Sequence, residues 1–169
     1  MKDPLNRIAV IGLALGGVFG FVGTVVTQSN LRSAAWGIDS VGLVVATALL
    51  ALKYFRAGND CVAGGFLVFA IGEAVMLSGT AASLEASVPA FAAGTALWSA
   101  ALLLTGVPKT FALWTRLISV VGALLFSITS ARIFWGEQLL PTSSPLPFFA
   151  YPFLILTFAG WIWTLLKTP

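Results

Sequence analysis

Long apolar runs recur along this chain, and short polar or proline-containing turns separate them. Six runs can be delimited, at residues 8–27, 36–55, 61–83, 88–107, 110–134 and 148–166. An α-helix rises ~1.5 Å per residue, so about 20 residues cross the ~30 Å hydrocarbon core of a bilayer. The pattern therefore predicts an all-α fold, in which residues 1–169 form a single transmembrane domain with a bundle of six transmembrane helices.

Small residues recur at four-residue spacing in two of these runs. Gly12, Gly16 and Gly20 form one strip, and Ala92, Ala96 and Ala100 form another. Small side chains let the backbones of membrane helices approach closely, so we expect both strips to lie at helix–helix contacts. For the glycine strip, packing inside one chain is the first expectation, and a seam between two copies is the alternative.

The basic residues are distributed unequally between the two sides of the predicted bundle. Six spans return the chain to its starting side, which then carries seven of the nine Lys and Arg residues: Lys2, Arg7, Lys53, Arg56, Lys109, Arg116 and Lys167. Arg32 and Arg132 lie on the other side. Because cytoplasmic loops of membrane proteins are rich in Lys and Arg, both termini are expected in the cytoplasm. We expect an inner or plasma membrane, as in a bacterial inner-membrane protein.

Composition supports this class and narrows the chemistry. The chain is 59% hydrophobic and 9% charged, whereas about a quarter of the residues of a soluble domain are charged. It has no histidine and one cysteine, Cys61, so the commonest metal ligand and the usual general base at neutral pH are both missing. We therefore expect no metal, no cofactor and no nucleic-acid partner, and an enzyme is less favoured than a non-enzyme.

Glu73 is the sharpest candidate for function, because it lies near the middle of the run at 61–83. A carboxylate at the centre of a bilayer costs roughly 2.5–3.5 kcal/mol on insertion scales, so such a residue usually faces the protein interior. Arg116 can either reach toward Glu73 or extend to the water interface. Two interpretations follow: a proton or cation site modulated by Arg116, or a structural residue that locks helices together. Asp39, by contrast, is expected one turn inside its helix, where water reaches it.

Hydroxyl side chains lie beyond Glu73, toward the side opposite the termini. Ser78 and Thr80 follow it on the same run, and Ser127 and Thr129 lie near the corresponding end of the fifth run. They are expected either to line a polar cavity or to bond to their own helix backbone. The prolines of residues 135–147 exclude a continuous helix there, which leaves a lid, a docking surface or a simple connection.

These features favour a small-solute transporter or channel, coupled to an ion or to protons, with Glu73 in the membrane. The alternative is an accessory or scaffold subunit of a larger membrane complex, and an enzyme acting on a lipid or quinone is least favoured. The expected partner is the lipid bilayer, with a second copy or other membrane subunits as further candidates. Three spans in each half would allow an inverted repeat, which the sequence leaves open.

Overall fold

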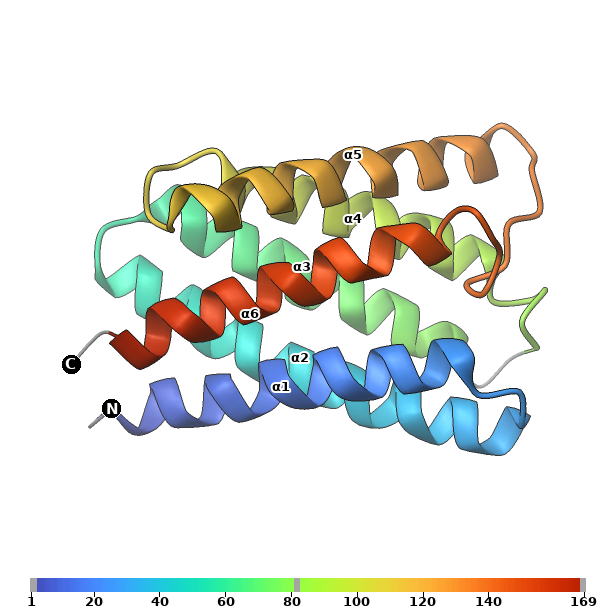
Figure 1. The fold of residues 1–169 in the computed structure, drawn as a ribbon, viewed down its shortest axis with the longest axis horizontal. Helices are drawn as coiled ribbons and strands as arrows, with labels where there is room; N and C mark the ends of the chain where they lie inside the picture. Colours follow the sequence, from blue (N-terminus) through green and yellow to red (C-terminus); the bar gives the residue numbers. More distant parts are fainter. Residues whose placement is uncertain (1–2, 81–82, 168–169) are drawn as a thin grey trace.

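The computed structural model describes residues 3–80 and 83–167, in which every regular element is a helix (Figure 1). The elements are α1 (Pro4–Val25), α2 (Ser29–Arg56), α3 (Asp60–Gly79), α4 (Val88–Gly106), α5 (Leu113–Phe134), the 3-10 helix η1 (Phe148–Ala150) and α6 (Tyr151–Lys167). Counting η1 and α6 as one segment, six helices are long and apolar enough to cross a membrane. The predicted all-helical architecture with six such helices is confirmed.

The second helix begins earlier than the sequence pattern indicated. It starts at Ser29 rather than at residue 36, since residues 29–35 contain no proline or glycine that would break a helix. The guanidinium of Arg32 donates to the Val26 carbonyl oxygen at 2.7 and 3.1 Å, which satisfies an acceptor at the end of α1. A polar stretch that resembled a loop is therefore the first two turns of α2.

The helices form a closed ring in chain order. Each helix contacts the next one along the chain, and α6 contacts α1 as well as α5. Both described ends of the chain lie at the same end of the bundle (Figure 1). We call this the terminal end; the opposite end, which carries residues 26–28, 83–87 and 135–147, is the distal end. This arrangement places α3 and α6 across the ring from each other.

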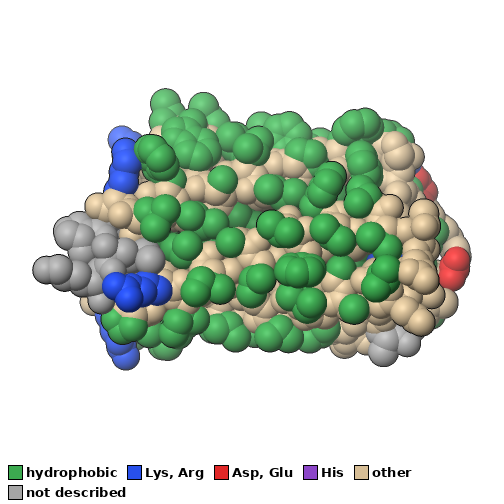
Figure 2. All heavy atoms as spheres, turned by 60° about the horizontal axis from the view of Figure 1, so that its bottom comes forward, with side chains coloured by type: hydrophobic (Ala, Val, Ile, Leu, Met, Phe, Trp, Pro, Cys, Tyr) green, Lys and Arg blue, Asp and Glu red, His purple; other side chains and the backbone are tan. Residues whose placement is uncertain are grey.

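The surface has the distribution expected of a protein surrounded by lipid. Figure 2 shows apolar side chains covering the visible side of the bundle, with Lys and Arg gathered at the terminal end and acidic residues at the distal end. Large apolar side chains are exposed on every long helix, including Ile11 at 60%, Leu67 at 53% and Leu117 at 58%. Soluble monomers rarely expose so much contiguous apolar surface, so the fold supports a membrane location.

The first close seam joins α1 to α2 through glycines. A Cβ atom added at Gly12 would collide with the carbonyl oxygen of Gly42. Gly16 faces Leu43, and Gly20 faces Asp39. The predicted glycine strip therefore lies against α2 of the same chain, which is the intramolecular arrangement.

The alanine strip behaves differently from the glycine strip. Ala92 is buried, Ala96 is partly exposed and Ala100 is exposed. A four-residue step turns ~40° around a helix, which carries Ala100 onto the outer surface. The close approach between α3 and α4 uses Gly72 and Gly94 instead, because a Cβ added at either glycine would lie 3.1–3.2 Å from the other's carbonyl oxygen.

Aromatic side chains fill the middle of the ring toward the terminal end. Phe66 of α3 contacts Trp161 of α6, with ring centroids 4.7 Å apart, and Phe69 of α3 contacts Phe158 of α6 at 5.7 Å. Trp98 of α4 stacks on Phe69 at 5.5 Å. We call these five residues the aromatic core. It closes the centre of the bundle in the half that leads to the terminal end.

Candidate functional site

A cavity of about 170 Å³ occupies the distal half of the ring, between α1, α2, α3, α6 and the start of α4. A water molecule needs roughly 10–15 Å³ on this measure, so several waters or one small organic molecule fit. The polar lining residues are Thr24, Ser29, Arg32, Ser33, Asp39, Ser40, Glu73, Thr80, Ser83, Ser87 and Tyr151. The aromatic lining residues are Phe21, Trp36, Phe91, Trp98, Tyr151 and Phe158.

The cavity runs from the distal surface to the middle of the bundle. Ser29, Ser33 and Ser83 line it and are exposed, whereas Glu73 is only 1% exposed and Phe158 only 3%. Phe158, like Trp98, belongs to the aromatic core. The inner end of the cavity therefore coincides with the layer that closes the bundle toward the terminal end.

Glu73 lies at this inner end, about 20 Å along α3 from Asp60. The hydroxyl of Ser40 on α2 donates a 2.7 Å hydrogen bond to Oε1 of Glu73. Oε2 is buried without a hydrogen-bond partner. The indole N–H of Trp98 also interacts with this carboxyl, but it does not reach hydrogen-bonding geometry. One oxygen is thus held by the protein, and the other is buried without a hydrogen-bond partner among the described residues.

Asp39 is a second buried carboxyl in the same cavity, and the prediction that water reaches it near the start of its helix is wrong. Because α2 begins at Ser29, Asp39 lies about 15 Å inside the helix rather than one turn in. It is 7% exposed, its Oδ1 has no hydrogen-bond partner, and its charge is close enough to interact with that of Glu73. Gly20 makes room for it, since a Cβ there would lie 2.9 Å from Oδ2 of Asp39.

Unpartnered polar atoms are concentrated at this site. Among the described residues, five buried side-chain polar atoms have no hydrogen-bond partner, and three belong to cavity residues: Asp39 Oδ1, Glu73 Oε2 and Trp98 Nε1. Buried polar groups in folded proteins nearly always have a partner, so an unpartnered group needs an explanation. Three such atoms from two neighbouring carboxyl residues and one indole therefore mark this part of the bundle as the candidate site.

Arg116 does not approach Glu73. Its Nε donates to the carbonyl oxygen of Gly106 at 3.0 Å, and its Nη2 donates to that of Val107 at 2.8 Å. These carbonyls lie at the end of α4, where a cation is favourable because the last carbonyls of a helix lack intrahelical donors. The modulating role expected for Arg116 is therefore not supported by its position near the terminal end.

The four predicted hydroxyl residues do not share one cavity. Thr80 lines the cavity described above, while Ser78 is exposed and donates to the carbonyl oxygen of Val75 at 2.6 Å. Thr129 is buried and donates to the carbonyl oxygen of Leu125 at 2.9 Å. Ser127 pairs with Ser99 at 2.5 Å in a separate hollow. Thr80 also donates to a backbone carbonyl oxygen, that of Leu77, at 2.8 Å, so Ser78, Thr80 and Thr129 all bond to their own helix backbone.

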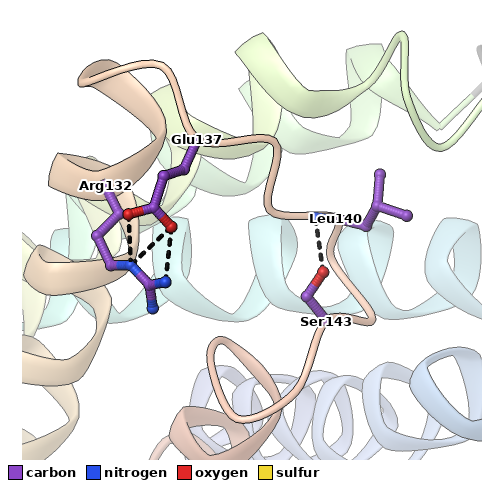
Figure 3. A network of polar contacts seen from close by, with 4 residues as sticks. All are labelled: Arg132, Glu137, Leu140 and Ser143. Carbon is purple, nitrogen blue, oxygen red and sulfur yellow. Dashed lines mark hydrogen bonds and ion pairs between the residues drawn. The ribbon is translucent and has the colours of Figure 1, made fainter.

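The proline-containing connection folds over the distal end of the bundle. Arg132 and Glu137 form an ion pair of 2.6 Å at its start, and the backbone N–H of Leu140 donates to Ser143 Oγ at 2.9 Å (Figure 3). The Tyr151 hydroxyl donates to the Pro141 carbonyl oxygen at 2.8 Å, and both residues line the cavity. This connection therefore helps to form the cavity.

In the part of the chain that the structure describes, no group of three or more His, Cys, Asp or Glu side chains could hold a metal ion. No protein-family model, curated protein or solved structure matches this chain. The class of the protein is consequently defined by its own geometry, as a membrane-type ring of six helices around a cavity with two buried carboxyl groups.

Proposed function

We propose that this protein is a small transporter of an inner or plasma membrane, and that Asp39 and Glu73 bind a proton or cation during transport. The observation that carries the proposal is that both carboxyl groups are buried, each has an unpartnered oxygen, and both line one cavity that reaches the distal surface. A mid-membrane carboxyl in a cavity is typical of substrate and proton pathways.

A purely structural role would leave a different pattern. A carboxyl that only joins helices lowers its burial cost by pairing both oxygens with donors. Glu73 receives one hydrogen bond, from Ser40, and Oε2 is left without one. Asp39 lies close to Glu73, where two negative charges repel each other, so the pair is unfavourable unless a proton or cation is present.

The closure of the cavity at one end suits transport by alternating access. In such transporters the binding site, near the middle of the bilayer, opens to one side at a time. Here the site is reached from the distal end, and the aromatic core separates it from the terminal end. With the basic terminal end in the cytoplasm, as the charge distribution favours, this conformation faces the outside.

The experiment is solute-driven proton flux in proteoliposomes that contain the purified full chain and a trapped pH indicator. Na⁺, K⁺, Mg²⁺, choline and glutamate are applied separately. For wild type we expect at least one solute to change the internal pH, and we expect Glu73→Gln to abolish that change. Ser127→Ala, in the separate hollow, is the matched control and retains flux.

The result that overturns the proposal is correctly folded wild type that moves no protons with any solute. An equal flux in wild type and in folded Glu73→Gln also overturns it. Constant association of a stoichiometric second membrane protein, together with no flux, favours the accessory-subunit hypothesis instead.

A further inference from the structure

We infer that the ligand of the cavity is a small organic cation, with an ammonium group and a compact apolar body. The inference rests on the proposed function, because it takes the cavity to be the substrate site, and it names the substrate class. Four properties of the cavity lead to it: its charge, its walls, its available oxygen ligands and its size.

The charge of the inner cavity favours a cation. Asp39 and Glu73 supply two carboxyl groups at its inner end. Of the described residues that line it, Arg32 is the one Lys or Arg, and its guanidinium already donates to the carbonyl oxygens of Val26 and Thr27. A negative ligand would therefore meet repulsion without a free partner, whereas a positive ligand compensates the buried carboxylates.

The walls favour an organic rather than an inorganic cation. Trp98, Tyr151 and Phe158 line the cavity, and the face of an aromatic ring attracts an ammonium group. The Arg32 guanidinium lies over the Trp36 ring in this way, 6.0 Å from its centroid. A hard metal ion instead needs about six oxygen ligands. Besides the two carboxyl groups, the inner end offers the Ser40 hydroxyl, which donates to Glu73. A substituted ammonium ion needs fewer oxygen ligands and gains from apolar contact.

The volume sets the size of the ligand. About 170 Å³ accommodates a compact molecule of a few carbon atoms, with its charged group near the carboxyl groups and its remainder against Phe91 and Leu154. A molecule of this kind can also enter from the distal end past the small side chains of Ser29, Ser33 and Ser83.

Binding of the cation is expected to be coupled to proton release. One carboxyl O–H bond breaks heterolytically as the cation arrives, and the proton passes to water in the cavity, so one positive charge replaces another. Among the described residues that line the cavity, the titratable or charged ones are Arg32 and Asp39 on α2, Glu73 on α3 and Tyr151 on α6. Affinity for the cation should consequently increase with pH, as the carboxyl groups lose their protons.

The test compares choline with 3,3-dimethylbutan-1-ol, its neutral carbon analogue, by calorimetric titration of the full chain in detergent. We expect choline to bind at least about tenfold more tightly, since charged partners are stronger than neutral ones. Glu73→Gln should weaken choline binding by about tenfold, and Phe158→Leu by roughly threefold or more through loss of the ring face. Ser127→Ala is the control and binds normally.

Several results would overturn the inference. They are equal binding of choline and the neutral analogue, choline affinity independent of both Glu73 and pH, or binding of Na⁺ or K⁺ without choline. Phe158→Leu and the pH dependence keep the test decisive if Glu73→Gln fails to fold. Glu73-dependent flux of another solute without choline binding refutes this inference alone, whereas choline binding without flux of any solute refutes the transport proposal alone.

Discussion

At the scale of single residues, the Glu73 carboxyl is bonded on one side only. The Ser40 hydroxyl fixes Oε1 at 2.7 Å, and this bond holds the carboxyl group in one orientation between α2 and α3. Oε2 is buried without a hydrogen-bond partner. Ser40 is thus a positioning residue, and it follows Asp39 directly in the sequence. One segment of α2 therefore supplies both the second carboxyl group and the donor that orients the first.

Glu73 could be found from the sequence, whereas its surroundings could not. A lone carboxylate in the middle of an apolar run is visible because of its high cost in lipid. Asp39 was missed because its depth depends on where α2 begins, and the polar residues 29–35 resembled a loop. Trp98 was missed because an apolar helix gives no sign of which ring faces a cavity. The partner of Arg116 stayed open because the length of its side chain allows several, and it bonds to the carbonyl oxygens of Gly106 and Val107.

Glu137, in the connection that follows α5, pairs with Arg132 and gives a pH-dependent prediction for a group outside the spans. The hydrogen bond from Arg132 lowers the pKa of the Glu137 carboxyl below its ordinary value of 4.5. Its stabilising contribution is therefore complete above about pH 4.5 and is lost as the pH falls through the lowered pKa. Because the pair is exposed, we expect a small effect that high salt removes.

The measurement for this pair is the difference in Tm between wild type and Glu137→Gln, recorded from pH 7 to pH 2 at low and high salt. The difference should shrink toward acid pH and at high salt. Glu85→Gln removes the same charge at the same end of the bundle and is the control. A difference that grows at acid pH would contradict the assignment of the ion pair.

At the scale of helices, glycine positions set how closely neighbours approach. Gly12 meets Gly42 between α1 and α2, and Gly72 meets Gly94 between α3 and α4. Backbones that touch in this way gain dispersion contacts along their length, which is the main attraction between helices in lipid. Although α1 and α2 lie close together, Gly20 has no side chain, and this leaves space between the two helices for the Asp39 carboxyl group.

The effect of alanine substitution on stability should differ between glycines at a helix–helix contact and glycines that face open space. A Cβ at Gly12 collides with the Gly42 carbonyl, so Gly12→Ala is expected to lower the free energy of unfolding by about 1–3 kcal/mol. Gly37→Ala, on α2, meets nothing within 4 Å and should be neutral or slightly stabilising. Reversible unfolding in mixed micelles measures both variants. Equal stability of the two would contradict the α1–α2 seam.

The number and order of the helices could be predicted because each span must be long and apolar. Contacts between helices were harder to predict, as the alanine strip shows. Ala100 has the residue type of a seam but lies on the outer surface, while Gly94 makes the close contact two residues from Ala92. Small residues indicate where a close approach is allowed. Which helix uses it depends on the rotation of every helix in the ring.

At the scale of the whole molecule, charge and cavity define two unlike ends. The terminal end carries most of the described Lys and Arg residues (Figure 2). The distal end carries the mouth of the cavity. The rule for positive charges then predicts a cytoplasmic terminal end and an external cavity.

This orientation can be measured by cysteine labelling in intact cells. In a Cys61→Ser background, we expect a membrane-impermeant maleimide to label Gln138→Cys, in the distal connection, without permeabilising the cells. Lys109→Cys, in the connection at the terminal end, should be labelled only after permeabilisation. Both positions are exposed. The reverse labelling pattern would mean that the cavity opens toward the cytoplasm.

Closure of the ring between α6 and α1 means that no helix is first by structural necessity. The start of α1 and the end of α6 lie at one end of the bundle, and so does the connection between α4 and α5 (Figure 1). A circular permutant can be made by linking the end of α6 to the start of α1 and cutting the connection between α4 and α5. Its chain would run from α5 through α6 and α1 to α4. It would keep the number of crossings, the sidedness of both ends and every wall of the cavity.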